Sequence, residues 1–310
     1  MTRHFLTFED LSREELLHVF KRAAFLKAER AAGRYLHRHL EGRAVGMIFN
    51  KHSTRTRVSF ECGINELGGR AVVLSEGQTQ MSRGEPVSHT ARTLSRYLAA
   101  LVIRTYAQSL LSDLARFGSI PIINALTDEG HPCQVLTDIF TALEKFPGLP
   151  VESLKVAWIG DGHNMANSWI EAAGFFGFAL KLACPEGFEP APSVLVRAQA
   201  RTPDVILTHD PREAVRGALA VNTDVWASMG QEAELARREK AFRSFLVDAA
   251  LMAQADPRAI FMHCLPSHPG EEVTEEVLES PASAIFDEAE NRLHVQKALM
   301  EFLIPPLGNR

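Results

Sequence analysis

Residues 44–69 read A-V-G-M-I-F-N-K-H-S-T-R-T-R-V-S-F-E-C-G-I-N-E-L-G-G. The apolar run Ala44–Phe49 has the length of a buried strand. From Val58 onward apolar side chains recur at helical spacing until Gly68-Gly69 stops them. The stretch therefore predicts a strand, a polar turn and a helix, with residues 53–57 where the helix starts.

That turn is rich in hydrogen-bond donors. The first backbone N–H groups of a helix have no partner within it, and the helix dipole is positive there. Hydroxyl and guanidinium groups add to them, from Ser53, Thr54, Arg55, Thr56 and Arg57. This donor cup (residues 53–57) suits a phosphate. A capped helix with exposed arginines is the alternative, and a nucleoside triphosphate is not implied because the Gly-Lys-Ser/Thr ending of a Walker loop is missing.

Apolar runs of strand length alternate with helical patterns along the whole chain. The further strands are expected at residues 70–74, 101–103, 121–126, 155–159, 180–183, 205–207, 219–221 and 260–262. The helices are expected at about 12–32, 90–99, 135–146, 167–177, 192–200 and 288–303. This alternation predicts an α/β fold of two doubly wound domains, each with a central parallel sheet flanked by helices, joined by long helices. The expected domains are 1–147, with the helix 288–310 packing back on it, and 148–287.

Composition indicates an ordinary enzyme. The chain has 310 residues, of which 46% are hydrophobic and 23% charged, and its net charge is −5. That charge argues against nucleic acid as a partner, since phosphate backbones attract basic surfaces. The four cysteines include no Cys-x-x-Cys, and the chain shows neither a membrane-spanning apolar run nor a signal-peptide pattern. We therefore expect a cytoplasmic protein that does not bind a membrane.

Polar side chains follow the carboxyl ends of six predicted strands. They are residues 53–57, Arg104, residues 131–134, Asn164, Asp224 and residues 263–264. In open α/β sheets ligands bind in the crevice outside these ends. Six such clusters are more than loops alone would lead us to expect, and they predict the location of a ligand site.

Single clusters have simpler explanations. Arg104 offers a planar fork of donors for a phosphate or a carbonyl oxygen, but an arginine after a strand is more often a surface ion pair. His131 can donate to a carbonyl oxygen, or it belongs only to the turn that starts a helix. Residues 160–162 (Gly-Asp-Gly) lack the third glycine of a dinucleotide fingerprint, which argues against NAD. The group His263, Cys264 and His268 lacks a further nearby ligand, which argues against a metal.

Taken together, the motifs resemble those of the aspartate/ornithine transcarbamylase family, and most closely those of anabolic ornithine carbamoyltransferases. The resemblance covers nearly the whole chain in order. It is carried by Ser53-Thr54-Arg55-Thr56-Arg57, Val102-Ile103-Arg104-Thr105, Asn124-Ala125-Leu126, His131-Pro132-Cys133-Gln134, Asp224-Val225-Trp226, Ser228-Met229-Gly230, His263-Cys264-Leu265-Pro266 and Glu290-Asn291-Arg292-Leu293-His294.

The resemblance implies transfer of a carbamoyl group from carbamoyl phosphate to L-ornithine, in arginine biosynthesis, by a homotrimer or a multiple of one that needs no metal or organic cofactor. It implies that the first domain and the His-Cys-Leu-Pro turn bind carbamoyl phosphate through Ser53, Thr54, Arg55, Thr56, Gln80, Arg104, His131, Pro132, Cys133, Gln134, Cys264, Leu265 and Arg292. It implies an ornithine site of Asn164, Asp224, Ser228 and Met229. The catalytic residues it implies are Arg55, Thr56, Arg104, His131 and Cys264.

Two differences separate the chain from aspartate transcarbamylases, which carry a lysine in the loop matching residues 75–86 and no cysteine in the turn matching Cys264. An acidic Asp224 also suits an ammonium group better than a second carboxylate. Departures from the family pattern occur at His89, Ala100 and His163, beside the ligand positions, and put stability or fine specificity in question. The alternatives are a transcarbamylase for putrescine or an acylated ornithine, and a noncatalytic anion-binding relative.

Overall fold

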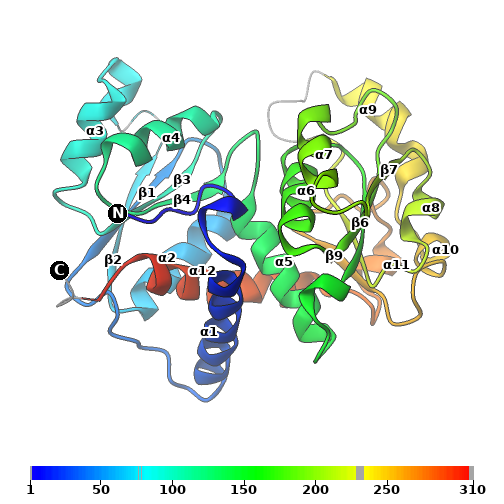
Figure 1. Cartoon of the computed structure of the whole chain (residues 1–310), viewed down its shortest axis with the longest axis horizontal. Coiled ribbons are helices and arrows are strands. Elements are labelled where there is room, and N and C mark those ends of the chain that lie inside the picture. Colours follow the sequence, from blue (N-terminus) through cyan, green and yellow to red (C-terminus); the bar gives the residue numbers. More distant parts are fainter. Residues whose placement is uncertain (1, 76, 78, 228–233, 307–310) are drawn as a thin grey trace. The chain divides into compact units, whose positions relative to one another are not determined.

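The computed structural model describes residues 2–75, 77, 79–227 and 234–306. The chain divides into two compact units (Figure 1). Unit 1 consists of Met1–Thr137 and Glu290–Arg310, and unit 2 of Asp138–Ala289. Helices α5 (Pro132–Lys145) and α12 (Ile285–Leu303) each contribute residues to both units.

In unit 1 the described strands form one parallel sheet in the order β2-β1-β3-β4. The strands are β1 (Ala44–Phe49), β2 (Arg70–Ser75), β3 (Ala100–Arg104) and β4 (Ile122–Leu126). The helices beside them are α1 (Arg13–Ala31), α2 (Thr54–Glu66), α3 (Val87–Leu94) and α4 (Gln108–Phe117). Ile48, Leu101 and Ile103 are buried in one apolar cluster with residues of α3 and α4, so these helices cover one face of the sheet.

Unit 2 holds a second parallel sheet, in the order β7-β6-β5-β8-β9 among the residues described. The strands are β5 (Lys155–Ile159), β6 (Ala179–Ala183), β7 (Val205–Thr208), β8 (Ala220–Thr223) and β9 (Ile260–His263). The helices are α6 (Asn164–Phe176), α7 (Pro192–Gln199), α8 (Pro211–Val215), α9 (Leu235–Phe242), α10 (Ala249–Met252) and α11 (Glu275–Leu278). Ala157 and Ile159 of β5 face a core shared with α8, α10 and α11, while α6 and α7 lie on the other side of the sheet (Figure 1). The expected pair of parallel α/β sheets flanked by helices is confirmed.

The strand orders place a topological switch point in each sheet. The chain of unit 1 runs from β1 to β2 on one side and then returns to place β3 on the other side of β1. In unit 2 it runs from β5 through β6 to β7 and returns to place β8 beside β5. Ligands of doubly wound sheets bind where the order reverses, at the carboxyl ends of the strands. The ends of β1 and β3, and those of β5 and β8, are therefore the places to look for a site.

Several helices begin earlier than the sequence pattern predicts. We expected helices from 135 and from about 167, but α5 begins at Pro132 and α6 at Asn164. Proline fits the first helical turn because the N–H it lacks would have had no partner there. The polar start of α6 hides its periodicity, and no helix was predicted over α4 although Leu110, Leu111 and Leu114 have helical spacing. Arg104 and His263 are the last residues of their strands rather than the first of the turns.

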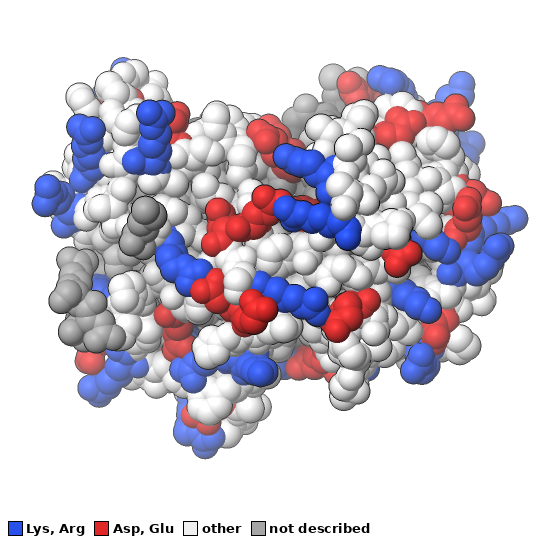
Figure 2. All heavy atoms as spheres, in the orientation of Figure 1, with Lys and Arg blue, Asp and Glu red and all other residues white. Residues whose placement is uncertain are grey.

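Charged side chains of both signs are interspersed on the face seen in Figure 2. Lysines and arginines lie among aspartates and glutamates there and do not merge into one basic field, as a net charge of −5 leads us to expect. Within the described residues, no helix combines the length and the apolar character that crossing a membrane requires.

Candidate active site

The donor cup lies at the start of α2, directly after β1. Ser53 is the N-cap with extended backbone, and its Oγ accepts a hydrogen bond from the backbone N–H of Thr56 at 3.2 Å. The first turn of α2 contains no acidic residue, so nothing in that turn offsets the positive end of the helix dipole. Thr54 is exposed and Arg55 half-buried, so both remain accessible to a ligand in unit 1.

An arginine from the far end of the chain joins this cup. Arg292 of α12 is 3% exposed and donates hydrogen bonds to Thr56 Oγ1 and to Gln134 Oε1. One guanidinium group thus connects α2, α5 and α12 within unit 1. Three residues named separately from the sequence therefore belong to one hydrogen-bonded group.

Arg104 and His131 lie at the ends of the neighbouring strands β3 and β4. Both are buried, with exposed fractions of 8% and 4%. Burial lowers the pKa of His131 well below its usual value of 6.5, and the positive charges of Arg292 and Arg104 lower it further. The imidazole is therefore neutral at neutral pH and can donate one N–H without adding a charge.

Pro132 and Cys133 begin α5 next to this group. Cys133 is 1% exposed, and burial raises the pKa of its thiol to about 12 although Arg292 acts in the opposite direction. A thiol that stays protonated is a poor nucleophile. We infer that Cys133 contributes packing and its backbone to the site.

Sequence reasoning missed Lys51. Its ammonium forms an ion pair with Asp128 and lies 4.7 Å from the ring centroid of Tyr106. The pair connects the turn that leads to Ser53 with the turn that leads to His131. A lysine beside the donor cup was a visible signal, but its partner lies 77 positions away and only the fold identifies it.

Gln80 is separate from these residues in the chain. It opens a short 3-10 turn, η2 (Gln80–Arg83), between β2 and α3, and its side chain is exposed. Because β2 is the edge strand of the sheet, this loop leaves the sheet at its border.

In unit 2 a carboxylate and a thiol meet at the ends of β8 and β9. Cys264 Sγ donates to Asp224 Oδ1 at 3.4 Å, and the backbone N–H of Val225 donates to the same oxygen at 2.8 Å. Burial raises the pKa of Cys264 well above its usual value, and the nearby negative charges of Asp224, Glu288 and Asp138 raise it further. Cys264 is therefore a neutral hydrogen-bonding group and not a thiolate.

The backbone around Cys264 is held by a buried histidine. His263 Nδ1 accepts a hydrogen bond from the N–H of Leu265 at 2.9 Å, which places the ring proton on Nε2, 3.2 Å from Glu272 Oε1. The backbone N–H of His263 donates to Glu288 Oε2 at 3.0 Å. Leu265 has a φ of 60° and precedes Pro266 in a cis peptide bond.

The remaining predicted residues of unit 2 are only partly described. Asn164 is the first residue of α6 and is 7% exposed, at the carboxyl end of β5. Ser228 and Met229 lie outside the described residues. The unusual His163 is the N-cap of α6, while in unit 1 the unusual His89 is exposed on α3 and Ala100 is buried in β3.

The ligand atoms of Asp224, His263 and Cys264 lie within 4.8 Å of one another, as those of a metal site do. Both ring nitrogens of His263 are already engaged with protein groups, and the Cys264 thiol is protonated. A cation would have to displace a hydrogen bond and a proton, so this group is better suited to hydrogen bonding. A second such group in the described chain, of His268, Glu271 and Glu272, shares its buried carboxylate with His263.

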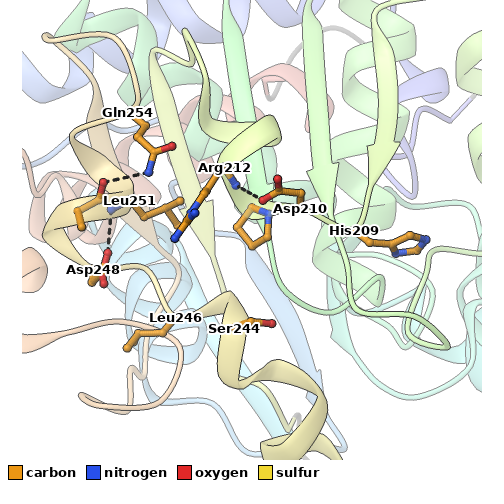
Figure 3. A pocket seen from close by; sticks show the side chains of 10 residues that line it. His209, Asp210, Arg212, Ser244, Leu246, Asp248, Leu251 and Gln254 are labelled. Carbon is orange, nitrogen blue, oxygen red and sulfur yellow. Dashed lines mark hydrogen bonds between the residues drawn. The ribbon is translucent and has the colours of Figure 1, made fainter.

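A cavity of about 380 Å³ lies elsewhere in unit 2, between α8 and α10 (Figure 3). Its two carboxylates already cap helices: Asp210 accepts from the N–H of Arg212 at 2.9 Å, and Asp248 from that of Leu251 at 2.7 Å. None of the predicted site residues lines it. The switch points of the sheets, not this cavity, hold the candidate site.

Comparison with known proteins matches each half of the chain to a family model. Residues 3–144 match the family model described as aspartate/ornithine carbamoyltransferase, carbamoyl-P binding domain, and residues 152–303 match its Asp/Orn binding domain. The chain is 54% identical over 306 residues to the ornithine carbamoyltransferase of Oleidesulfovibrio alaskensis, covering 98% of this chain and 99% of that protein. It is 52% identical over 308 residues to that of Geobacter metallireducens, covering 98% and 100%.

Solved structures give the same result. The ornithine carbamoyltransferase of Pyrococcus furiosus superimposes with a TM-score of 0.92 at 44% identity, over 98% of this chain and 97% of that one. The anabolic enzyme of Campylobacter jejuni superimposes with a TM-score of 0.90 at 40% identity, over 97% and 98%. With both domain models matched in order and relatives similar from end to end, the chain belongs to the aspartate/ornithine carbamoyltransferase family.

Proposed function

We propose that this protein is an ornithine carbamoyltransferase, which transfers the carbamoyl group of carbamoyl phosphate to the side-chain amine of L-ornithine and releases L-citrulline and phosphate. The observation that carries the proposal is the buried group of Arg104, His131 and Arg292 beside the donor cup of unit 1. Similarity to relatives named for this activity supports it, and one of them is described as anabolic, which favours arginine biosynthesis in the cytoplasm.

In this proposal unit 1 binds the carbamoyl donor. The phosphate lies at the start of α2, where Ser53, Thr54 and Arg55 and the helix dipole supply donors and positive charge. The carbamoyl oxygen accepts hydrogen bonds from Arg104 and from the neutral His131. A neutral donor is useful here because it polarises the carbonyl without tightening the hold on the anionic substrate as a whole.

Unit 2 binds the amino acid. The Asp224 carboxylate pairs with its α-ammonium group, a charge-assisted hydrogen bond that selects an amino acid over a simple amine. Asn164, close to the neighbouring strand end, supplies an amide that can donate to the substrate carboxylate and accept from its ammonium. Cys264 offers a neutral thiol next to Asp224.

The reaction is an acyl transfer. The side-chain amine, with a pKa of about 10, first loses a proton to solvent, and its lone pair then forms a bond to the carbamoyl carbon. The carbonyl π electrons move onto oxygen, where hydrogen bonds from Thr56, Arg104 and His131 stabilise the oxyanion. When the oxyanion collapses, the C–O bond to phosphate breaks and its electron pair leaves with phosphate, whose charge Arg55 offsets. A second proton passes from the attacking nitrogen, which is positively charged after bond formation, to the leaving phosphate. This chemistry needs neither a metal nor an organic cofactor.

A citrulline colour assay tests the proposal. The purified protein is offered carbamoyl phosphate with L-ornithine, putrescine, N-acetylornithine or L-aspartate in parallel, and phosphate release is followed beside ureido formation. Of the four amines, we expect only ornithine to give a product. Product with putrescine or acetylornithine would move the specificity to another amine, and saturable carbamoyl phosphate binding without any product would favour a noncatalytic relative.

We further propose that the active form is a homotrimer, or a multiple of one, in which Gln80 completes the site of a neighbouring subunit. Gln80 is exposed in the isolated chain, on the loop that follows edge strand β2. Val58 of α2 and Val72 of β2 are exposed at 52% and 40%, and apolar side chains on adjacent elements suit a contact between copies.

A further inference from the structure

We propose that Arg238 of α9 is a positioning residue for the amine substrate: it joins the turn after β5, which leads into Asn164, to the turn after β8, which begins with Asp224. The inference rests on the proposed role of unit 2 in binding ornithine. It gives Arg238 no contact with the substrate, since its side chain is 6% exposed and turned to protein partners.

One guanidinium nitrogen makes both connections. Arg238 Nη1 donates to Asp161 Oδ2 at 2.7 Å and to the backbone oxygen of Trp226, also at 2.7 Å. On the other edge, Nε lies 3.5 Å from Glu234 Oε2. Charge-assisted hydrogen bonds with buried partners are among the stronger polar interactions in proteins. The two turns are therefore held together by a single side chain from a third element.

This connection lies where the sheet stops holding the strands. β5 and β8 are paired as far as Ile159 and Thr223, and Thr223 Oγ1 donates to the Ile159 oxygen at 2.5 Å. Beyond this pair of residues, backbone hydrogen bonds of the sheet no longer fix the distance between the two segments that follow β5 and β8. Asp161 and Trp226 follow within a few residues of it, and Arg238 spans them.

The distance between these turns controls the distance between the two side chains proposed to bind the substrate. Asn164 lies three residues after Asp161, and Asp224 two residues before Trp226. Asp224 lies between the end of β8 and the hydrogen bond at Trp226, and Asn164 lies between the hydrogen bond at Asp161 and the body of α6, so both have little freedom. A change in the separation of the turns therefore displaces the amide relative to the carboxylate, and misplaced binding groups cost affinity and rate.

Aromatic packing makes the connection specific for arginine. The guanidinium carbon of Arg238 lies 4.9 Å from the ring centroid of Phe188 and 5.8 Å from that of Phe242, and these rings form an apolar cluster with Trp226. A planar guanidinium stacks on such rings, whereas a lysine ammonium keeps the charge but not the plane. The turn itself has little slack, since a Cβ at Gly162 would lie 2.2 Å from a backbone nitrogen.

Charge adds a second reason for the arginine. Burial raises the pKa of Asp161, Arg238 opposes that effect, and the nearby Asp224 carboxylate raises the pKa again. Without Arg238 the turn would hold a buried carboxylate close to Asp224. Asp161 would then take up a proton or move away, and either change would alter the surroundings of Asp224.

The test is a comparison of the two Michaelis constants in a matched set of variants. Arg238→Met removes the connection, Arg238→Lys keeps the charge, and Asp161→Asn weakens one of the two hydrogen bonds. The control is Arg237→Met, because Arg237 directly precedes Arg238 in α9 and also lies over Phe188, 5.0 Å from its centroid, but does not join the two turns. Citrulline formation and thermal unfolding are measured for each protein.

We expect Arg238→Met to raise KM for ornithine by roughly tenfold or more, the effect of one lost charged hydrogen bond, while KM for carbamoyl phosphate changes by less than about twofold. For Arg238→Lys, KM for ornithine should lie between the values of Arg238→Met and the wild type. For Arg237→Met it should equal the wild-type value. The effect of replacing both Arg238 and Asp161 on KM for ornithine should be smaller than the sum of the two single effects, because both replacements disrupt the same Arg238–Asp161 hydrogen bond.

The inference is overturned if Arg238→Met lowers the unfolding temperature but leaves the ratio of the two KM values unchanged. If Arg238→Met does not fold, the inference is tested by the ratio of the two KM values in Arg238→Lys and Asp161→Asn. Absence of citrulline from the wild type is a different failure: it removes the proposed function, and the inference falls with it.

Discussion

The positive charge around the donor cup comes from single arginines with different surroundings. Arg104 is buried at the end of β3, whereas Arg55 is half-buried on the first turn of α2. In the proposed reaction, replacing either by alanine removes a donor from the oxyanion or from the leaving phosphate. We expect turnover to fall by roughly 10²- to 10³-fold in each variant, the usual effect of losing one such donor.

Steady-state kinetics on folded variants checks this, with far-ultraviolet circular dichroism to show that the fold is retained. Arg116→Ala is the control, since Arg116 is exposed on α4 and contacts Phe117. Near-normal turnover in both Arg55→Ala and Arg104→Ala would show that these arginines are not at the reacting group.

The Asp224→Asn substitution removes the negative charge of the side chain but keeps its shape. Asparagine can still accept the hydrogen bonds from Val225 and Cys264, so the local structure should persist. The lost charge should weaken ornithine binding by about ten- to hundredfold, the range for a hydrogen bond to a charged group, with little effect on carbamoyl phosphate. Asp210→Asn, at the capping carboxylate of α8, is the control.

Calorimetry with each ligand separates the two effects. Equal weakening of carbamoyl phosphate and ornithine by Asp224→Asn would indicate that Asp224 supports the structure of unit 2 instead of recognising an ammonium group.

At the scale of whole elements, two helices of unit 1 both begin with a serine N-cap, but only one of them belongs to the proposed phosphate site. Ser12 and Ser53 each accept a hydrogen bond from the helix that follows, and Ser12 is part of a capping box with Glu15. Replacing either serine by alanine should lower the free energy of unfolding by about 1 kcal/mol. Only Ser53→Ala should also raise KM for carbamoyl phosphate, because the start of α2, and not that of α1, belongs to the proposed phosphate site.

Urea unfolding and kinetics of the two variants provide the comparison, and each serves as the other's control. If Ser53→Ala behaved like Ser12→Ala in both measurements, the hydroxyl of Ser53 would be a cap and no more.

Helix α12 carries a histidine that makes stability depend on pH. His294 is fully buried, and burial lowers its pKa from 6.5 to about 4; nearby Lys297 lowers it too, and Glu290 opposes the shift. Between these two pKa values the unfolded chain binds a proton that the folded chain does not. Stability therefore falls as pH drops from 6.5 towards about 4.

His294→Gln removes this contribution. The variant should lose less stability than the wild type over the same pH interval, whatever its stability near neutral pH. Unfolding free energies from urea titrations across the interval give the two slopes. Parallel slopes would mean that His294 titrates alike in the folded and unfolded chain.

At the scale of the whole molecule, the proposal of shared sites predicts complementation. Arg55→Ala and Gln80→Ala chains are dissociated, mixed and reassembled. Some sites of a mixed oligomer then combine an intact Arg55 from one chain with an intact Gln80 from its neighbour. Activity should rise above the average of the two parents.

Activity equal to that average, with Gln80→Ala itself impaired, would mean that Gln80 serves its own subunit. Sedimentation of the mixtures shows that the oligomers have reformed, so that a failed exchange is not mistaken for a negative result.

The sequence by itself determined the α/β class, the strand-turn-helix unit around residues 44–69 and most of the candidate site. These features are local: a strand length, a helical spacing and a run of donors can each be recognised within a few neighbouring residues. Because parallel strands end at one edge of a sheet, naming the strand ends was enough to name Arg104, His131, Asp224 and Cys264. Comparison with known proteins then established the family to which those motifs pointed.

Tertiary structure alone decided which of these side chains meet and in what state. Arg292 reaches Thr56 across 236 positions, and no local pattern encodes that contact. The neutral His131 and the protonated Cys264 follow from burial and from neighbouring charges, which exist only in the folded chain. Arg238 belongs to the same class, since it is one of two adjacent arginines on a polar helix and only packing between distant segments brings it to Asp161 and Trp226.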